Sequence, residues 1–153
     1  MNKNKLISLL LLLTMSCIIF SFSMQIADVS NSQSGFIVNL VLTIFVPLFG
    51  NIFSVDTLTH IVRKTAHFAE YSLLGILGAN ANRSWKDSKY SNLFYIYGIL
   101  NAILDETIQY FTPGRSCQIS DMILDSCGYL FGYIFLLLCI YMIKKYAKSP
   151  HTH

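Results

Sequence analysis

The chain has 153 residues, of which 54% are hydrophobic and only 12% are charged. A soluble domain carries about 25% charged residues, so this composition argues against an ordinary soluble domain and indicates a membrane protein. The net charge of +3 does not indicate nucleic-acid binding, because the basic residues lie in short clusters beside apolar runs, as membrane-flanking charges do. The length is that of one domain, and we expect residues 1–153 to form a single membrane domain.

The first apolar run covers residues 6–24 and follows Lys3 and Lys5. Its length is sufficient to cross a hydrocarbon core of about 30 Å. A cleaved signal peptide is the alternative, but the run is long for one and no clear cleavage site follows it. We expect a retained first transmembrane helix, and after it a polar loop over residues 25–35.

A second apolar segment, residues 36–53, is interrupted by Asn39, Pro47, Gly50 and Asn51. It is either a span or a helix that lies on or dips into the membrane. Further spans are predicted downstream, and a polar hairpin separates the last two. These spans cover residues 61–81, 93–110 and 122–143, and the hairpin covers residues 111–120.

The distribution of basic residues distinguishes the two possibilities for residues 36–53. If this segment does not span, the N-terminus, the loop at 82–92 and the C-terminus share one side, which holds eight basic residues against three on the other. If it spans, the split becomes five against six. Because cytoplasmic loops are enriched in Lys and Arg, the first arrangement is favoured. We therefore predict an all-α integral membrane fold: a four-helix transmembrane bundle with both termini in the cytoplasm, and residues 36–53 as an extra re-entrant or interfacial segment.

Polar side chains recur on one face of each of the last three predicted spans. Residues three or four apart share a helix face, and a rise of about 1.5 Å per residue places these faces at one depth in the outer half of the membrane. The residues are Arg63, His67 and Glu70 on the first of these spans, Asp105 and Gln109 on the second, with Glu106 offset from their face, and Asp121 and Asp125 on the third. Ionisable side chains in or near hydrocarbon are costly, so we interpret the cluster as a functional site.

Two further features bear on this cluster. The turn Thr112-Pro-Gly brings Arg115 back over it, and the planar guanidinium suits a phosphate or carboxylate group. Gly128 and Gly132 form a small-xxx-small pattern on the face of Asp125, which predicts close helix contact there. We therefore expect an outer-leaflet polar pocket for an anionic headgroup or a peptide carboxylate.

Other interpretations of the polar residues stay open. Arg63, Glu70, Asp105 and Arg115 could form a structural ion-pair network, since a buried charge must be paired. Glu70 or Asp105 could act as a general base with His67, which would make the chain a membrane-embedded hydrolase or transferase. An ion or proton path is the weakest interpretation, because the inner halves of the predicted spans hold no ionisable residue to continue it.

A metal site is conceivable, since several carboxylates and His67 meet at one depth. The residues lack a strong ligand spacing such as H-E-x-x-H, and the four cysteines show no C-x-x-C spacing. The sequence therefore predicts no metal ligand and identifies no cofactor.

The candidate residues lie in three ordered motifs: Arg63-Lys-Thr-Ala-His-Phe-Ala-Glu-Tyr71, then Asp105-Glu-Thr-Ile-Gln-Tyr-Phe-Thr-Pro-Gly-Arg115, then Asp121 followed by Gly128 and Gly132. These motifs resemble those of the VanZ-like membrane proteins. The similarity covers about residues 21–143, and its strongest motifs lie within residues 61–132. One position departs from the family pattern, because residue 125 is Asp where the family usually has Asn.

The resemblance implies a multi-pass protein of the bacterial cell envelope, typically of Gram-positive organisms. The name-giving member is associated with low-level resistance to the glycopeptide teicoplanin. The resemblance implies no particular reaction, so whether the chain is an enzyme stays open.

We expect the chain to bind or act on a cell-envelope component, either an anionic lipid-linked precursor or a glycopeptide-related ligand. The alternative is a hydrolase or transferase that acts on a phosphate- or sugar-bearing lipid. The catalytic candidates are Glu70, Asp105 and His67, and the ligand-binding candidates are Arg63, Glu106, Gln109, Arg115, Asp121 and Asp125.

Overall fold

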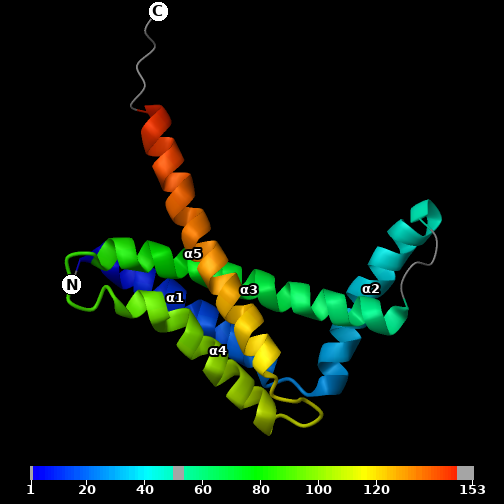
Figure 1. Cartoon of the computed structure of the whole chain (residues 1–153). Coiled ribbons are helices and arrows are strands. Elements are labelled where there is room, and N and C mark those ends of the chain that lie inside the picture. Colours follow the sequence, from blue (N-terminus) through cyan, green and yellow to red (C-terminus); the bar gives the residue numbers. More distant parts are fainter. Residues whose placement is uncertain (1, 50–53, 148–153) are drawn as a thin grey trace, which may run out of the picture.

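The computed structural model describes residues 2–49 and 54–147, without the side chains of residues 33 and 45–49. In these ranges the chain forms five helices and no strand (Figure 1). The helices are α1 (Lys3–Ser23), α2 (Ala27–Phe49), α3 (Val55–Trp85), α4 (Leu93–Phe111) and α5 (Ile119–Ala147). The predicted all-α class is therefore confirmed.

The predicted loop at residues 25–35 is wrong from Ala27 onward, because α2 begins there. Two features stabilise this polar helix start. Asp28 lies in the first turn, where a carboxylate interacts favourably with the positive end of the helix dipole. The backbone N–H of Ala27 also donates to the carbonyl oxygen of Pro113, at 3.3 Å. The apolar segment 36–53 thus continues α2 as far as Phe49, and its last residues lie outside the described ranges.

Helices α1, α3 and α4 run side by side, whereas α5 crosses α3 and its C-terminal half leads away from the other helices (Figure 1). Helix α5 packs chiefly against α3 and less extensively against α4, and α2 contacts α3. This arrangement does not confirm the predicted four-helix transmembrane bundle.

Glycine residues bring α3 and α5 into close contact, as the small-xxx-small pattern predicts. A Cβ atom added at Gly132 would overlap the backbone carbonyl group of Ser72, and one added at Gly75 would overlap the backbone of Tyr129. A Cβ atom added at Gly128 would lie 2.8 Å from the carbonyl oxygen of Phe68. The two backbones can approach this closely only because these positions lack side chains. The contact holds the N-terminal half of α5 against the middle of α3.

Tyr129 lies at the centre of the hydrophobic core and links three helices. Its side chain is fully buried, and its ring lies against Gly78 of α3 and Gly98 of α4. Its hydroxyl donates a hydrogen bond of 2.5 Å to the carbonyl oxygen of Phe94. A buried tyrosine that finds a partner for its hydroxyl contributes both apolar area and a specific orientation.

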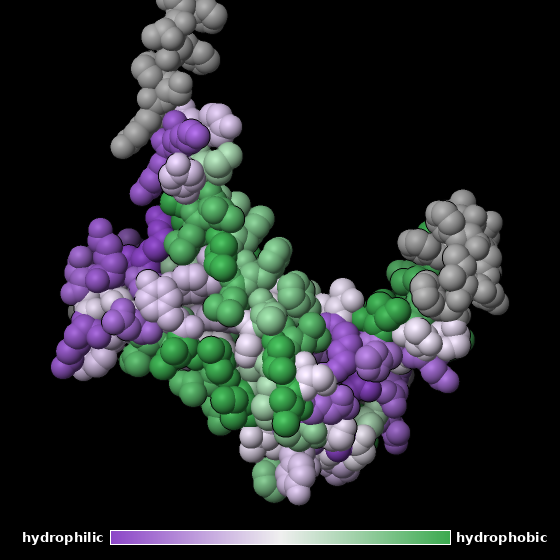
Figure 2. Space-filling model, in the orientation of Figure 1, coloured by the Kyte–Doolittle hydropathy of each residue, from purple (hydrophilic) through white to green (hydrophobic). Residues whose placement is uncertain are grey.

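Large hydrophobic side chains cover the outside of α1, α4 and α5, where Leu10, Leu104 and Leu138 are each more than half exposed. Figure 2 shows hydrophobic surface between two hydrophilic regions. One lies over the loop between α3 and α4, and the other lies over the N-terminal end of α3, near α2. An extended exposed apolar surface marks contact with a membrane or another protein. Among the described helices, α1 and α5 are long and apolar enough to cross a membrane. The surface therefore points to a membrane protein.

Candidate functional site

A cavity of about 180 Å³ lies where the end of α1, the first part of α2, the first half of α3 and the loop between α4 and α5 meet. It is lined by Phe22, Ser23, Gln25, Ser30, Ser34, Ile37, Val62, Arg63, Ala66, His67, Glu70 and Arg115. We call this space the main cavity. The predicted site residues among its lining are Arg63, His67, Glu70 and Arg115, so residues far apart in the chain meet as the sequence analysis expects.

The spacing of α3 explains why three of these side chains share the main cavity. Arg63, His67 and Glu70 are separated by four and three residues, so they lie above one another on one helix face. Arg115 comes from the loop between α4 and α5, where Gly114 has a φ of 76° that favours glycine. The backbone N–H of Arg115 donates to the carbonyl oxygen of Thr112 at 3.1 Å, which closes the predicted turn.

Two guanidinium groups therefore line one small space. Among the described residues, neither Arg63 nor Arg115 belongs to an ion pair, since the pairs there are Lys64 with Asp121 and His67 with Asp125. The Nε atom of Arg115 is buried and has no hydrogen-bond partner among the described residues. Burial lowers the pKa of the Arg115 guanidinium from its usual value and the neighbouring charge of Arg63 lowers it further, whereas Asp105, Glu106 and Glu70 oppose this shift. The main cavity thus brings two guanidinium groups, which can donate to an anion, together with the carboxyl group of Glu70.

Asp105 is fully buried and lies beside the main cavity, behind Ser23. Its carboxylate accepts hydrogen bonds from the hydroxyl of Ser23 and, at 3.1 Å, from Nε2 of Gln109. Gln109 and Ser23 together hold the carboxylate in one orientation. Gln109 therefore lies in the site as predicted, but its contact is with Asp105 and it does not line the main cavity.

Glu106 is fully buried and supports the loop that carries Arg115. One of its oxygens, Oε2, accepts a hydrogen bond of 2.7 Å from the backbone N–H of Gln118, directly before α5. The other oxygen, Oε1, has no partner among the described residues. Glu106 thus forms a hydrogen bond with the backbone directly before α5.

Asp121 lies in a second, smaller cavity of about 40 Å³, which Arg63 and His67 also line. Its carboxylate pairs with the ammonium group of Lys64 and accepts a hydrogen bond from Ser120 at 3.2 Å. Asp121 is therefore adjacent to the main cavity and already has a cationic partner.

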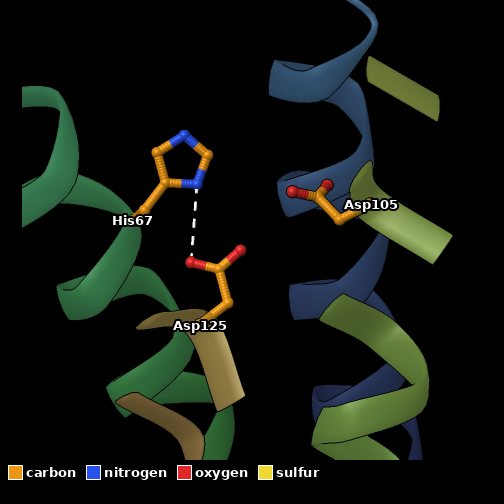
Figure 3. Close-up of side chains that lie close together, drawn as sticks. All are labelled: His67, Asp105 and Asp125. Carbon is orange, nitrogen blue, oxygen red and sulfur yellow. Dashed lines mark ion pairs between the residues drawn. The ribbon is translucent and has the colours of Figure 1, made fainter. Parts of the chain in front are cut away.

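Asp125 is fully buried, and neither carboxylate oxygen has a hydrogen-bond partner within residues 2–49 and 54–147. Nδ1 of His67 lies 3.7 Å from Oδ1 of Asp125, close enough for an ion pair but too far for a hydrogen bond (Figure 3). Across from this pair is the carboxylate of Asp105, and one ligand atom from each of the three residues lies within 4.8 Å of the others. Helices α3, α4 and α5 thus bring polar side chains to one point, as predicted from their depth.

The structure does not show the structural ion-pair network that was the alternative interpretation of these residues. That network required ion pairs among Arg63, Glu70, Asp105 and Arg115, and the ion pairs in the described part of the chain involve other residues. In the described part of the chain, the buried Asp105 and Glu106 accept hydrogen bonds, and the ion-pair contact of Asp125 is with His67 and not with an arginine.

Several residues of the site were not predicted. Ser23 binds Asp105, Lys64 pairs with Asp121, and the fully buried hydroxyl of Tyr71 has no partner. Ser30 and Ser34 line the main cavity because the predicted loop is helical there. The only signal for Lys64 and Tyr71 was their place beside Arg63 and Glu70 in the same motif.

Comparison with known proteins gives one match. A family model described as VanZ/LLP1 matches residues 8–141, a range that includes all of the site residues named above. No curated protein and no solved structure matches the chain.

Proposed function

The chain belongs to the VanZ/LLP1 family, and from this premise we propose that it is a multi-pass protein of the bacterial envelope whose main cavity binds the anionic group of a lipid or lipid-linked envelope component. The observation that carries the proposal is the pair of guanidinium groups, Arg63 and Arg115, which share the main cavity with Glu70 and form no ion pair with a carboxylate among the described residues. Arginine presents a planar fork of donors that matches phosphate or carboxylate oxygens.

The rest of the lining supports a ligand that is partly polar and partly lipid. The hydroxyls of Ser23, Ser30 and Ser34 offer additional donors and acceptors for a headgroup, a sugar or a peptide. The side chains of Ile37 and Val62 form an apolar part of the same wall. A headgroup bound here would have hydrocarbon beside it, as a membrane lipid requires.

The side of the membrane follows from charge. With four spans and α2 re-entrant or interfacial, the basic residues of the 82–92 loop lie inside and the main cavity opens toward the outer leaflet. Because the VanZ family is linked to teicoplanin resistance, we propose that binding an envelope component in this cavity lowers susceptibility to that glycopeptide.

A cellular experiment tests this proposal. A susceptible Gram-positive host would express the wild-type chain, Arg115→Gln, or Arg83→Gln, whose arginine lies in the last turn of α3, away from the main cavity. We expect the wild type and Arg83→Gln to reduce teicoplanin susceptibility equally, and Arg115→Gln to restore it at the same level of protein in the membrane. Equal protection by all three proteins would contradict the proposal.

A second candidate function is hydrolysis or group transfer on the bound lipid, and the contact between His67 and Asp125 favours it. His67 lines the main cavity, and the carboxylate of Asp125 lies 3.7 Å from its Nδ1. An acid that orients an imidazole supports general-base catalysis. In this role His67 would accept the proton of an attacking water or hydroxyl group, while Arg63 and Arg115 hold the anion.

The lipid composition of the same strains separates the two functions. An enzyme changes the lipid profile of the host, and His67→Gln abolishes that change while the protein still retains its lipid. A profile that is identical with and without the wild-type protein would rule out the enzymatic candidate and leave the binding function intact.

A further inference from the structure

The point where α3, α4 and α5 converge contains more than an acid–base pair. His67, Asp105 and Asp125 each come from a different helix, and one ligand atom from each lies within 4.8 Å of the others (Figure 3). In a tetrahedral zinc site with bonds of about 2.0–2.1 Å, the ligand atoms lie about 3.4 Å apart. Nδ1 of His67 and Oδ1 of Asp125 are already 3.7 Å apart, so small side-chain rotations would complete such a geometry.

Unpartnered polar atoms at this point are a second, independent observation. Asp125 is fully buried, yet in the part of the chain that the structure describes both of its carboxylate oxygens lack a hydrogen-bond partner, and Nδ1 of His67 lacks one too. These atoms face one another and the carboxylate of Asp105 (Figure 3). Buried polar groups are nearly always satisfied, and an orphan cluster of oxygen and nitrogen atoms is what a metal site shows without its ion.

The charges lead to the same conclusion. Asp105, Glu106 and Asp125 are fully buried, and no lysine or arginine among the described residues forms an ion pair with any of them. A buried charge is normally paired or coordinates a metal ion. A divalent cation between Asp105 and Asp125 supplies the missing positive charge.

We propose that His67, Asp105 and Asp125 bind a divalent transition-metal ion, Zn²⁺ or Mn²⁺. One imidazole nitrogen with two carboxylates suits these ions better than Ca²⁺ or Mg²⁺, which prefer oxygen ligands alone. Hydrogen bonds from Ser23 and Gln109 fix the Asp105 carboxylate, as supporting contacts do around metal ligands. Of the three ligands, His67 lines the main cavity, so the cavity provides the access path that the ion needs.

Metal titration of the purified full-length chain tests this site. The protein, in detergent micelles and stripped with a chelator, is titrated with Zn²⁺ by calorimetry and with Mn²⁺ by electron paramagnetic resonance. We expect about one tight site per chain, and Asp125→Asn and His67→Gln to weaken its affinity by more than about 100-fold, since even the loss of a supporting contact costs 10–100-fold. Asp87→Asn is the control, because Asp87 is an exposed carboxylate in the loop between α3 and α4, away from the three ligands.

Wild-type protein that binds neither ion more tightly than Asp125→Asn and His67→Gln would overturn the proposal. If either variant fails to fold, thermal unfolding of the wild type decides, because a bound ion must raise its Tm and the absence of a rise excludes the site. Arg115→Gln separates this inference from the proposed anion binding. It keeps all three metal ligands, so we expect it to lose the anion and to bind the metal ion as the wild type does.

Discussion

Buried polar groups at the two ends of the helical assembly differ in one respect. Around Tyr129, which we call the core end, the buried groups are satisfied: the hydroxyl of Tyr129 donates to Phe94, and the amide of Asn82 donates to the hydroxyl of Tyr133. Around His67, which we call the cavity end, many are not. The buried side-chain atoms of this end without partners in the described residues belong to His67, Tyr71, Glu106, Arg115 and Asp125, whereas nearer Tyr129 the side-chain oxygen of Asn101 is unpartnered.

The satisfied polar groups of the core end contribute to stability, whereas the unsatisfied groups of the cavity end indicate a binding function. An unsatisfied buried polar group destabilises the folded state by about 1–3 kcal/mol. The cavity end contains several such groups, and a role in folding does not explain them. Protein regions that bind ligands commonly carry such groups, because the ligand supplies the missing partners. Substitutions should therefore lower stability at the core end, and should change binding or even raise stability at the cavity end.

The largest expected effect is at the core end, where α3 and α5 touch. Gly132→Ala adds a Cβ atom that overlaps the backbone of Ser72, and backbone atoms cannot move aside as a flexible side chain can. We expect a loss of 3 kcal/mol or more in free energy of unfolding, at or above the usual range of about 1–3 kcal/mol for overpacking. Denaturation in detergent measures it. Gly35→Ala is the control, because nothing lies within 4 Å of a Cβ atom there, and equal stability of the two variants would refute the close contact.

Removing the hydroxyl of Tyr129 is the next test. Tyr129→Phe leaves the buried ring in place but removes the hydrogen bond to the carbonyl oxygen of Phe94. We expect the free energy of unfolding to fall by about 1–2 kcal/mol. Lipid and metal binding at the cavity end should not change. If this variant lost lipid or metal binding while its free energy of unfolding stayed unchanged, the assignment of stability to the core end and binding to the cavity end would be wrong.

At the cavity end we expect a substitution to raise the free energy of unfolding instead of lowering it. Asp125→Asn replaces a fully buried carboxylate, which has no hydrogen-bond partner among the described residues, with a neutral amide of the same size. In a chelator, where no metal ion can bind, we expect the free energy of unfolding to rise by about 1–2 kcal/mol, because the cost of burying this carboxylate exceeds the gain from its contact with His67, which at 3.7 Å is too long for a hydrogen bond. A thermal melt with chelator present measures the change. A decrease as large as that of Tyr129→Phe would mean that Asp125 is a structural residue.

The smallest expected effect is at the partly exposed ion pair between Lys64 and Asp121, whose side chains are 26% and 16% exposed. Lys64→Gln should cost no more than about 1 kcal/mol, as partly exposed ion pairs generally do. Raising the salt concentration should reduce the difference between variant and wild type, because salt screens exposed charges. If Lys64→Gln instead lowered the free energy of unfolding by several kcal/mol at every salt concentration, the pair would be as important for stability as the contacts of the core end.

The comparison also shows what the sequence could and could not predict. Helical periodicity placed Asp105 and Gln109 on one face of α4, and the structure joins them by a hydrogen bond. The spacing of Gly128 and Gly132 predicted close helix contact on the face of Asp125, and the structure identifies α3 as the partner. Both successes concern which residues share a face of one helix, which a period of 3.6 residues determines.

The failures concern the relation between helices. The pairing of Asp121 with Lys64 depends on how α3 is rotated against α5, which close packing at Gly75 and Gly132 sets. Helix α2 begins in a segment rich in Ser, Asn and Gln, residues that favour caps and turns over helix interiors, so local propensity predicted a loop. The role of Ser23 could not be predicted either, because its partner Asp105 lies 82 residues away.

The central claim is that Arg63 and Arg115 bind an anionic group in the main cavity, and lipid retention tests it most directly. Native mass spectrometry of the purified protein would compare phosphatidic acid, which carries an exposed phosphate, with phosphatidylcholine. We expect the wild type and Arg83→Gln to retain phosphatidic acid selectively, and Arg115→Gln to bind it about 10- to 100-fold more weakly, since a charge-assisted hydrogen bond is worth about 1.5–3 kcal/mol. Equal retention of both lipids by the wild type, or equal retention of phosphatidic acid by all three proteins, would contradict the account.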